Sequence, residues 1–251
     1  MIASLPMYDR PETRAANDRL WQLIRARLPE GAPEHLTRSG DPWADWRDPG
    51  LVLSQACGLP YRARLHGHVA LVATPVHDLP CAPGAYFSVL VARRGDPRRQ
   101  FADFAGAVLA VNDGLSQSGW AAPQALAAEH GFSLDRTVLT GSHRASAEAV
   151  ARGAADLAAI DAVTWRMIRR WDDFADALRE IGETGTAPAL PYIAAPGQDT
   201  DALYAALEDA IAALSADDRE RLCLEGVTAV PAERYLAVPT PPQPENAAAP
   251  G

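Results

Sequence analysis

Short apolar runs alternate along the chain with segments in which apolar residues recur at helical spacing. Apolar runs bounded by turn residues predict β-strands, and recurrence every three to four residues predicts helices. The predicted strands are Ile2–Leu5, Leu51–Ser54, Val69–Ala73, Phe87–Ala92, Val108–Val111, Thr137–Thr140, Ala154–Ile160 and Tyr192–Ala195. The predicted helices are Thr13–Leu28, Trp120–His130, Arg144–Arg152, Val163–Trp171, Phe174–Leu178, Thr200–Leu214 and Asp217–Leu222. This alternation indicates an α/β protein.

The predicted elements fall into two groups. The middle of the chain, from about Arg94 to Gly182, has its own strands and helices in βα order. We therefore expect two α/β lobes joined by two crossover strands, with residues 1–89 and 186–238 in lobe 1 and residues 90–185 in lobe 2. The Pro- and Ala-rich tail, residues 239–251, is predicted to be disordered. Ligands of such sheets bind at the carboxyl ends of strands, so we expect a ligand in the cleft between the lobes.

Composition and charge exclude several classes of protein. The chain has 251 residues, of which 48% are hydrophobic and 22% charged, which is typical of a folded protein. Its net charge of −9 argues against nucleic-acid binding. All 23 basic residues are Arg and none is Lys. This excludes a pyridoxal phosphate Schiff base, a P-loop and the phosphate-binding Lys of a protein kinase, and we expect no cofactor.

The sequence has no pattern of a membrane-spanning helix or a secretory signal. It lacks a run of about 20 apolar residues, and its start lacks the basic and apolar regions of a signal peptide. We therefore expect either a cytoplasmic protein or one whose signal has been removed. Cys57, Cys81 and Cys223 show no C-x-x-C spacing, which disfavours zinc and thioredoxin-type chemistry. A disulfide between Cys57 and Cys81 is left open.

The polar loop Asn112–Gly119, between a predicted strand and a predicted helix, has the most informative candidate chemistry. Ser116, Gln117, Ser118 and Gly119 would place hydroxyls and backbone N–H groups at a helix N-terminus, which favours an anion. Ordinary N-capping by Ser116 or Ser118 is one alternative. Another is a serine-type hydrolase using Ser116 or Ser118 with His143, although the second glycine comes one position late for a G-x-S-x-G motif.

Further candidate ligand-binding residues lie where predicted strands end. These residues are Tyr8, Ser54, Gln55, His143 and Asp161. Asp161 is expected either to contact a cationic group of the ligand or to cap the helix that follows it. His66, His68 and His77 suggest a metal site only weakly, because no further ligand is specified, and ordinary core or surface histidines explain them better. We predict no metal site.

Four segments resemble, in the same order, motifs of the phosphate/phosphite/phosphonate solute-binding proteins of ABC transporters. They are Ala3–Tyr8 (ASLPMY), Leu53–Gly58 (LSQACG), Ser116–Gly119 (SQSG), and Gly141–His143 (GSH) with Ala149–Asp156 (AVARGAAD). The resemblance covers about residues 2–236. It implies a type II periplasmic-binding-protein fold, two α/β lobes with a double crossover, and a solute-binding protein that is not an enzyme.

The resemblance also implies roles for individual residues. In that family a Ser-Thr-Ser-Gly loop binds the anionic head group, and Ser116–Gly119 match it with Gln117 in place of Thr. His143 matches a Gly-His after the next strand, and Tyr8 matches a tyrosine of the first strand. Aminoalkylphosphonate binders carry a Gly-Asp-Pro near the second crossover, whereas residues 189–191 read Ala-Leu-Pro, so the carboxylate that binds the amine is missing.

The expected function is therefore capture of a small anionic or zwitterionic ligand, such as a phosphonate or phosphate, for ABC-type uptake or sensing. An ABC permease is the implied partner. The resemblance implies a periplasmic location, and because the sequence shows no signal peptide a cytoplasmic location is a real alternative. We expect a monomer that binds no nucleic acid and does not insert into a membrane.

Overall fold

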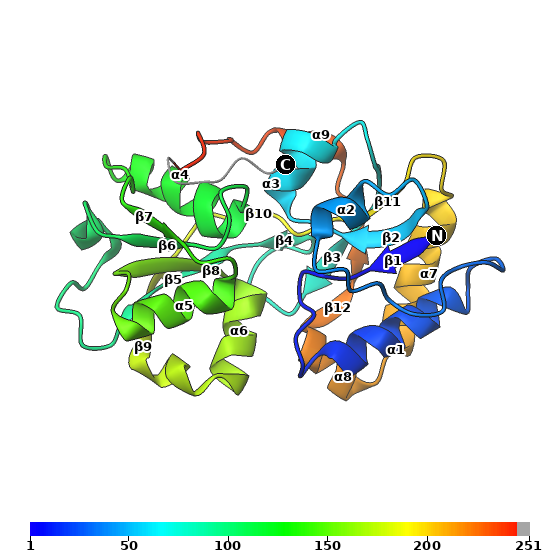
Figure 1. Cartoon of the computed structure of the whole chain (residues 1–251), viewed down its shortest axis with the longest axis horizontal. Helices are drawn as coiled ribbons and strands as arrows, with labels where there is room; N and C mark the ends of the chain where they lie inside the picture. Colours follow the sequence, from blue (N-terminus) through cyan, green and yellow to red (C-terminus); the bar gives the residue numbers. More distant parts are fainter. Residues whose placement is uncertain (245–251) are drawn as a thin grey trace. The chain divides into compact units, whose positions relative to one another are not determined.

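Two compact units make up the part of the chain, residues 1–244, that the computed structural model describes (Figure 1). Unit 1 comprises Met1–Ala85 and Pro188–Ala237, and unit 2 comprises Tyr86–Ala187 and residues 238–244. The chain passes between them at β4 (Ala85–Tyr86) and β10 (Ala187–Pro188), which pair as a two-stranded sheet. The lobe boundaries predicted from the sequence fall after residues 89 and 185, and these crossings lie at residues 85–86 and 187–188.

A sheet with the strand order β1-β2-β11-β3-β12 forms the centre of unit 1. Its strands are β1 (Ile2–Ser4), β2 (Leu51–Gln55), β3 (Ala70–His77), β11 (Tyr192–Ala194) and β12 (Leu224–Thr228). β1 and β2 are parallel, and β11 runs antiparallel to both of its neighbours. Every residue of β2 is buried, as expected for a strand covered on both faces.

Helices cover both faces of this sheet. On one face lie α1 (Arg14–Arg25), α7 (Thr200–Ala213) and α8 (Ala216–Leu222). The other face carries α2 (Pro42–Trp46), α3 (Gly58–Pro60), the π-helical turn η1 (Tyr61–Leu65) and α9 (Ala232–Leu236) (Figure 1). Separate apolar clusters fill the two layers, one around Trp21 and Leu207 and the other around Trp46 and Tyr235.

Unit 2 is built on a second sheet, with the strand order β7-β6-β8-β5-β9. Its strands are β5 (Ser88–Arg93), β6 (Leu109–Val111), β7 (Thr137–Leu139), β8 (Leu157–Asp161) and β9 (Leu178–Glu183). β6 is parallel to β7 and β8, and β5 is antiparallel to β8 and β9. The loops that follow β6 and β8 therefore leave the sheet at the same edge.

The helices of unit 2 also cover both faces. They are η2 (Phe101–Phe104), η3 (Gln117–Ala121), α4 (Ala122–Glu129), α5 (His143–Arg152), α6 (Ala162–Trp171) and η4 (Asp173–Ala177). α4 lies on one face, and α5 and α6 lie on the other (Figure 1). Trp120 packs with Leu90, Leu109 and Leu157 in the core under η3 and α4.

Two predicted elements differ from the structure. The helix predicted from Trp120 begins earlier, at Gln117, as the π-helical turn η3 that runs directly into α4. The helix predicted over Phe174–Leu178 is a 3-10 turn that ends at Ala177, and Leu178 begins strand β9. β9 pairs with β5 along its length, so sheet pairing overrides the weak helical pattern of this segment.

The predicted disordered tail, residues 239–251, lies partly outside the described residues, because the description ends at residue 244. Within the described part, the carbonyl oxygen of Pro242 accepts a hydrogen bond of 2.9 Å from the indole N–H of Trp120. This contact places the beginning of the tail on unit 2.

Candidate ligand-binding site

The segment after β6 in unit 2 forms the start of a helix. Ser116 has extended backbone dihedrals, and its hydroxyl accepts a hydrogen bond of 2.9 Å from the backbone N–H of Gly119. Residues Gln117–Glu129 then form one continuous helical segment, η3 followed by α4. Ser116 is therefore the N-cap, and Ser118 lies inside the first helical turn with its hydroxyl available for another partner.

The hydroxyl of Ser118 meets the imidazole of His143. The distance between Ser118 Oγ and His143 Nε2 is 2.7 Å, and the carbonyl oxygen of Ser118 accepts a hydrogen bond of 3.0 Å from Ser88 Oγ on β5. His143 is the first residue of α5, which Ser142 caps by accepting from the N–H of Ala145. The structure thus brings together two of the predicted site segments, at the starts of two helices.

The protonation state of His143 follows from its surroundings. Protein atoms surround the ring although part of the residue stays accessible, and this burial lowers the pKa of His143 from 6.5 to about 4, an effect that the backbone of Ala159 partly offsets. Nδ1 of His143 is buried and has no hydrogen-bond partner within residues 1–244. The imidazole is therefore neutral near pH 7. It acts at this pH as a hydrogen-bonding partner of Ser118 and not as a positive charge.

Gly119 is required by close packing at this point. A Cβ atom at this position would lie 1.8 Å from Asn112 Oδ1 and 3.2 Å from His143 Cε1. Asn112 was not singled out from the sequence beyond its place in the loop, yet its side-chain oxygen is buried in this cluster and accepts no hydrogen bond from residues 1–244. Gln117 is also buried, with 4% of its surface exposed. Position 119 thus lies in a densely packed polar cluster, and only glycine, which has no Cβ atom, fits there.

Asp161, the last residue of β8, caps α6. Its carboxylate accepts a hydrogen bond of 3.0 Å from the backbone N–H of Thr164, and only 2% of the residue is exposed. Its register partner on β5 is Ser88, the residue that donates to Ser118. Of the two interpretations of Asp161, the capping role is the one that this geometry shows directly.

The hydrolase alternative lacks its third catalytic group. A serine triad needs a carboxylate that orients the histidine, whereas Asp161 caps α6 and Nδ1 of His143 has no hydrogen-bond partner within residues 1–244. Ser118 also lies within a π-helical turn, not on the strained strand-to-helix turn that exposes a hydrolase nucleophile. The Ser118–His143 pair is therefore not a catalytic triad.

The predicted site residues of unit 1 divide between a pocket and the core. Tyr8 and Gln55 line a small pocket together with His77, Asn17 and Tyr192. Ser54 is fully buried, and its hydroxyl shares a hydrogen bond of 2.9 Å with that of Ser4. Sequence reasoning missed Asn17 and Tyr192 and took His77 only as weak evidence for a metal.

Residues 1–244 hold no group of three or more His, Cys, Asp or Glu side chains placed to bind a metal ion. The exposed His66 packs edge-on against Tyr61 at the end of η1, with ring centroids 6.0 Å apart. Cys57, Cys81 and Cys223 are not in disulfides. The disulfide between Cys57 and Cys81 that the sequence left open is therefore not formed in this structure.

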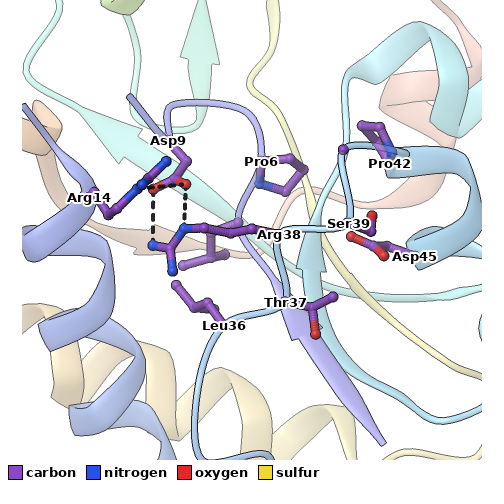
Figure 2. A pocket seen from close by; sticks show the side chains of 11 residues that line it. Pro6, Asp9, Arg14, Leu36, Thr37, Arg38, Ser39, Pro42 and Asp45 are labelled. Atoms are coloured by element: carbon purple, nitrogen blue, oxygen red, sulfur yellow. Dashed lines mark hydrogen bonds and ion pairs between the residues drawn. The ribbon is translucent and has the colours of Figure 1, made fainter. Parts of the chain in front are cut away.

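A larger pocket of about 300 Å³ in unit 1 is lined by none of the predicted site residues. Asp9 and Arg38 face each other on its wall, joined by two hydrogen bonds of 2.7 and 3.2 Å (Figure 2). Arg38 also binds Asp18 at 2.8 Å, and the two acids raise the pKa of its guanidinium. Because Asp9 and Asp18 neutralise the charge of Arg38, this guanidinium is not free to pair with an anionic ligand.

Comparison with protein families decides between the two functional classes, a solute-binding protein and a hydrolase. Residues 54–234, more than half of the 251, match the family of ABC transporter phosphonate periplasmic substrate-binding proteins. The chain belongs to this family. Membership makes it a solute-binding protein and not an enzyme, and the hydrolase alternative has no support. The family is periplasmic and works with ABC transporters.

Solved structures agree on the fold at low sequence identity. PhnD1 from Prochlorococcus marinus in complex with methylphosphonate is 15% identical, with a TM-score of 0.70 over 93% of this chain and 94% of that one. A binding protein component of an ABC phosphonate transporter from Pseudomonas aeruginosa is 16% identical, with a TM-score of 0.71 over 92% and 81% of the two chains. MatC from Rhodopseudomonas palustris with bound malate is 14% identical, with a TM-score of 0.61 over 95% and 93%.

These similarities show the type II periplasmic-binding-protein fold, as the family resemblance predicted. A search of curated protein sequences found no match. No helix within residues 1–244 is long and apolar enough to cross a membrane.

Proposed function

We propose that the protein binds the oxyanion head group of a phosphonate or phosphate through the Ser116–Gly119 segment and His143. The observation that carries this proposal is the pairing of Ser118 Oγ with His143 Nε2 in the first turn of the helix Gln117–Glu129. The first N–H groups of a helix have no intrahelical acceptors, and the helix dipole makes this end partly positive. Hydroxyl and N–H donors thus converge where an oxyanion needs them.

Neutral groups account for the recognition in this proposal. The Ser116–Gly119 segment contains no basic side chain, and burial lowers the pKa of His143 to about 4. In a molecule with a net charge of −9, an anion is held only by local hydrogen bonds, and those to a charged acceptor are stronger than neutral ones. Gly119 supports this arrangement because it lets the backbone approach closely.

The biological setting is part of the proposal. Membership of a family of ABC transporter substrate-binding proteins supports delivery of the ligand to an ABC permease. We infer that the protein does this as a monomer, and we regard uptake as the first role to test and sensing as the second. Size-exclusion chromatography with light scattering would give a single 26.8 kDa species, and a stable dimer would contradict the inferred state.

Calorimetric titration with methylphosphonate and with inorganic phosphate tests the site. Ser118→Ala removes the hydroxyl next to His143, and we expect the Kd to rise about tenfold or more, because a hydrogen bond to a charged group contributes about 1.5–3 kcal/mol. Ser133→Ala is the matched control, since Ser133 is an exposed serine of the same unit whose hydroxyl binds Asp135. Failure of both ligands to bind, or equal affinity in Ser118→Ala, would overturn the proposal.

A further inference from the structure

The pocket of about 300 Å³ in unit 1 contains a carboxylate that the ion pairs beside it do not use. All the residues that line this pocket lie between Leu5 and Asp45, so it belongs to unit 1 alone. The segment that follows β1 and the loop that precedes α2 form its walls. A volume of about 300 Å³ is at the lower end of the range for small-molecule sites, and it is far more than one water molecule needs.

Four charged side chains on one side of this pocket form a neutral network. Asp9 accepts hydrogen bonds of 2.7 and 3.2 Å from Arg38, and its carboxylate lies 3.9 Å from the guanidinium of Arg14. Asp18 accepts a further bond of 2.8 Å from Arg38. Two carboxylates thus offset two guanidinium groups, and this side of the pocket presents no net charge to a ligand.

Asp45, on α2, contributes a carboxylate that is not part of the network. Figure 2 shows it on the side of the pocket opposite to Asp9 and Arg14. Only 6% of the residue is exposed. Its backbone is bonded to Asp41 and Asp48, but its carboxylate makes no hydrogen bond or ion pair with residues 1–244. A mostly buried charge without a partner is unfavourable, so a cation bound beside Asp45 would stabilise the folded protein.

The walls of the pocket determine which kind of cation it takes. Residues 1–244 hold no group of three or more His, Cys, Asp or Glu side chains placed to bind a metal ion, and Ca²⁺ takes six to eight oxygen ligands. Leu5, Pro6, Leu36 and Pro42 give the pocket apolar surface. A primary ammonium donates to a carboxylate in a charge-assisted hydrogen bond, and a hydrocarbon body is favourably buried against apolar walls.

We propose that this pocket is a second binding site of the protein, for a small organic ammonium ion, and that Asp45 binds the ammonium group. The hydrocarbon part of the ligand packs against the leucine and proline side chains of the walls. This site is independent of the proposed function, because its residues all belong to unit 1 and the Ser116–Gly119 segment and His143 belong to unit 2. The protein then binds ligands of opposite charge at two separate sites.

Two probes of nearly equal size, one charged and one neutral, test the site. 2-Phenylethylamine is protonated at pH 7, whereas 2-phenylethanol carries a hydroxyl in place of the ammonium. Titration of the ¹⁵N-labelled protein with each probe, followed by amide chemical shifts, gives two Kd values. We expect the ammonium to bind about tenfold more tightly or better, because a hydrogen bond to a charged group is stronger than a neutral one. The largest shifts should lie within residues 36–45.

Asp45→Asn removes the charge and keeps the shape of the side chain. We expect the ratio of the two Kd values to fall to within about threefold of one, with the Kd of 2-phenylethanol nearly unchanged. Asp201→Asn, which alters an exposed aspartate of the same unit on α7, is the matched control and should keep the wild-type ratio. Because Asp45→Asn removes an unpaired charge, its melting temperature without ligand should not fall below that of the wild type.

Nuclear Overhauser effects in the unsubstituted protein provide a second measurement if Asp45→Asn does not fold. The aromatic protons of 2-phenylethylammonium should contact the methyl groups of Leu5 and Leu36. Equal affinity for the two probes, or no binding of the ammonium, would mean that the pocket holds solvent only and would overturn this inference. An unchanged ratio in folded Asp45→Asn, or contacts only within residues 86–187, would overturn it as well. Methylphosphonate binding is measured separately, so each proposal can fail without the other.

Discussion

Two histidines with lowered pKa values, His77 and His143, contribute to the response of the folded protein to acid. Burial lowers the pKa of both His77 and His143 to about 4, against 6.5 for a solvent-exposed imidazole. Below pH 6.5 the unfolded chain therefore takes up protons that the folded protein does not. Stability falls as the pH falls from about 7 towards 4, and it stops falling from this cause below the folded-state pKa.

For His77, only 7% exposed, the loss between pH 7 and pH 5 is about 2 kcal/mol of unfolding free energy. His77→Phe removes this titration, so we expect the variant to lose about that much less stability than the wild type over the same interval. Urea unfolding followed by tryptophan fluorescence at the two pH values measures it. Because the comparison is a difference between pH values, a constant packing cost of the substitution cancels. The same loss in both proteins would contradict the assigned pKa.

At the scale of the element, α6 depends on its cap. Asp161 accepts from the N–H of Thr164, and substitution of a capping residue by Ala costs about 1 kcal/mol, whereas Asn caps about as well as Asp. We expect Asp161→Ala to lower the free energy of unfolding by about that amount and Asp161→Asn to leave it nearly unchanged.

The same pair of variants separates capping from ligand binding. The expected affinity of folded Asp161→Asn for methylphosphonate equals that of the wild type. A loss of about 2 kcal/mol or more in the Asn variant, the scale of a charge-assisted hydrogen bond, would show instead that the carboxylate contacts a cationic or donor group of the ligand.

Elements with a strong hydrophobic pattern could be predicted from the sequence. Strands that form through pairing with a neighbouring strand could not. α1 places Leu20, Trp21 and Ile24 on one buried face, and this spacing is visible in the sequence. β12 pairs only with β3, and its central residues, Glu225 to Val227, show no clear alternation. The helical turn α3 ends at Pro60, and η1 begins at the next residue; proline is unfavourable in a helix interior, so the sequence did not predict a helix here.

The site residues likewise divide into those that could be predicted from the sequence and those that could not. Ser116–Gly119 and His143 could be predicted because a polar loop after a buried strand and before a helix is a local signal. In the pocket around His77, Tyr8 and Gln55 could be predicted because they follow or end strands, whereas Asn17 on α1 and Tyr192 on β11 could not, because they reach the pocket from elements distant in the sequence. The sequence does not show whether the side chain of the last residue of a strand has a hydrogen-bond partner.

At the scale of the whole molecule, the net charge is −9. The account of anion binding therefore depends on where in the molecule the ligand binds. Long-range attraction cannot bring an anion to this protein, so the account requires specific donors at one place. The polar cluster of Ser118, Gly119 and His143 is that place in our proposal. The larger pocket of unit 1, with its Asp9–Arg38 pair (Figure 2), is the competing location.

The measurement that tests this claim most directly is a crystal structure of the protein with methylphosphonate. The account predicts phosphonate oxygens within hydrogen-bonding distance of Ser118 Oγ and of the backbone N–H groups at the start of the helix Gln117–Glu129. An ordered methylphosphonate beside Asp9 and Arg38, with Ser118 still bonded only to His143, would contradict it.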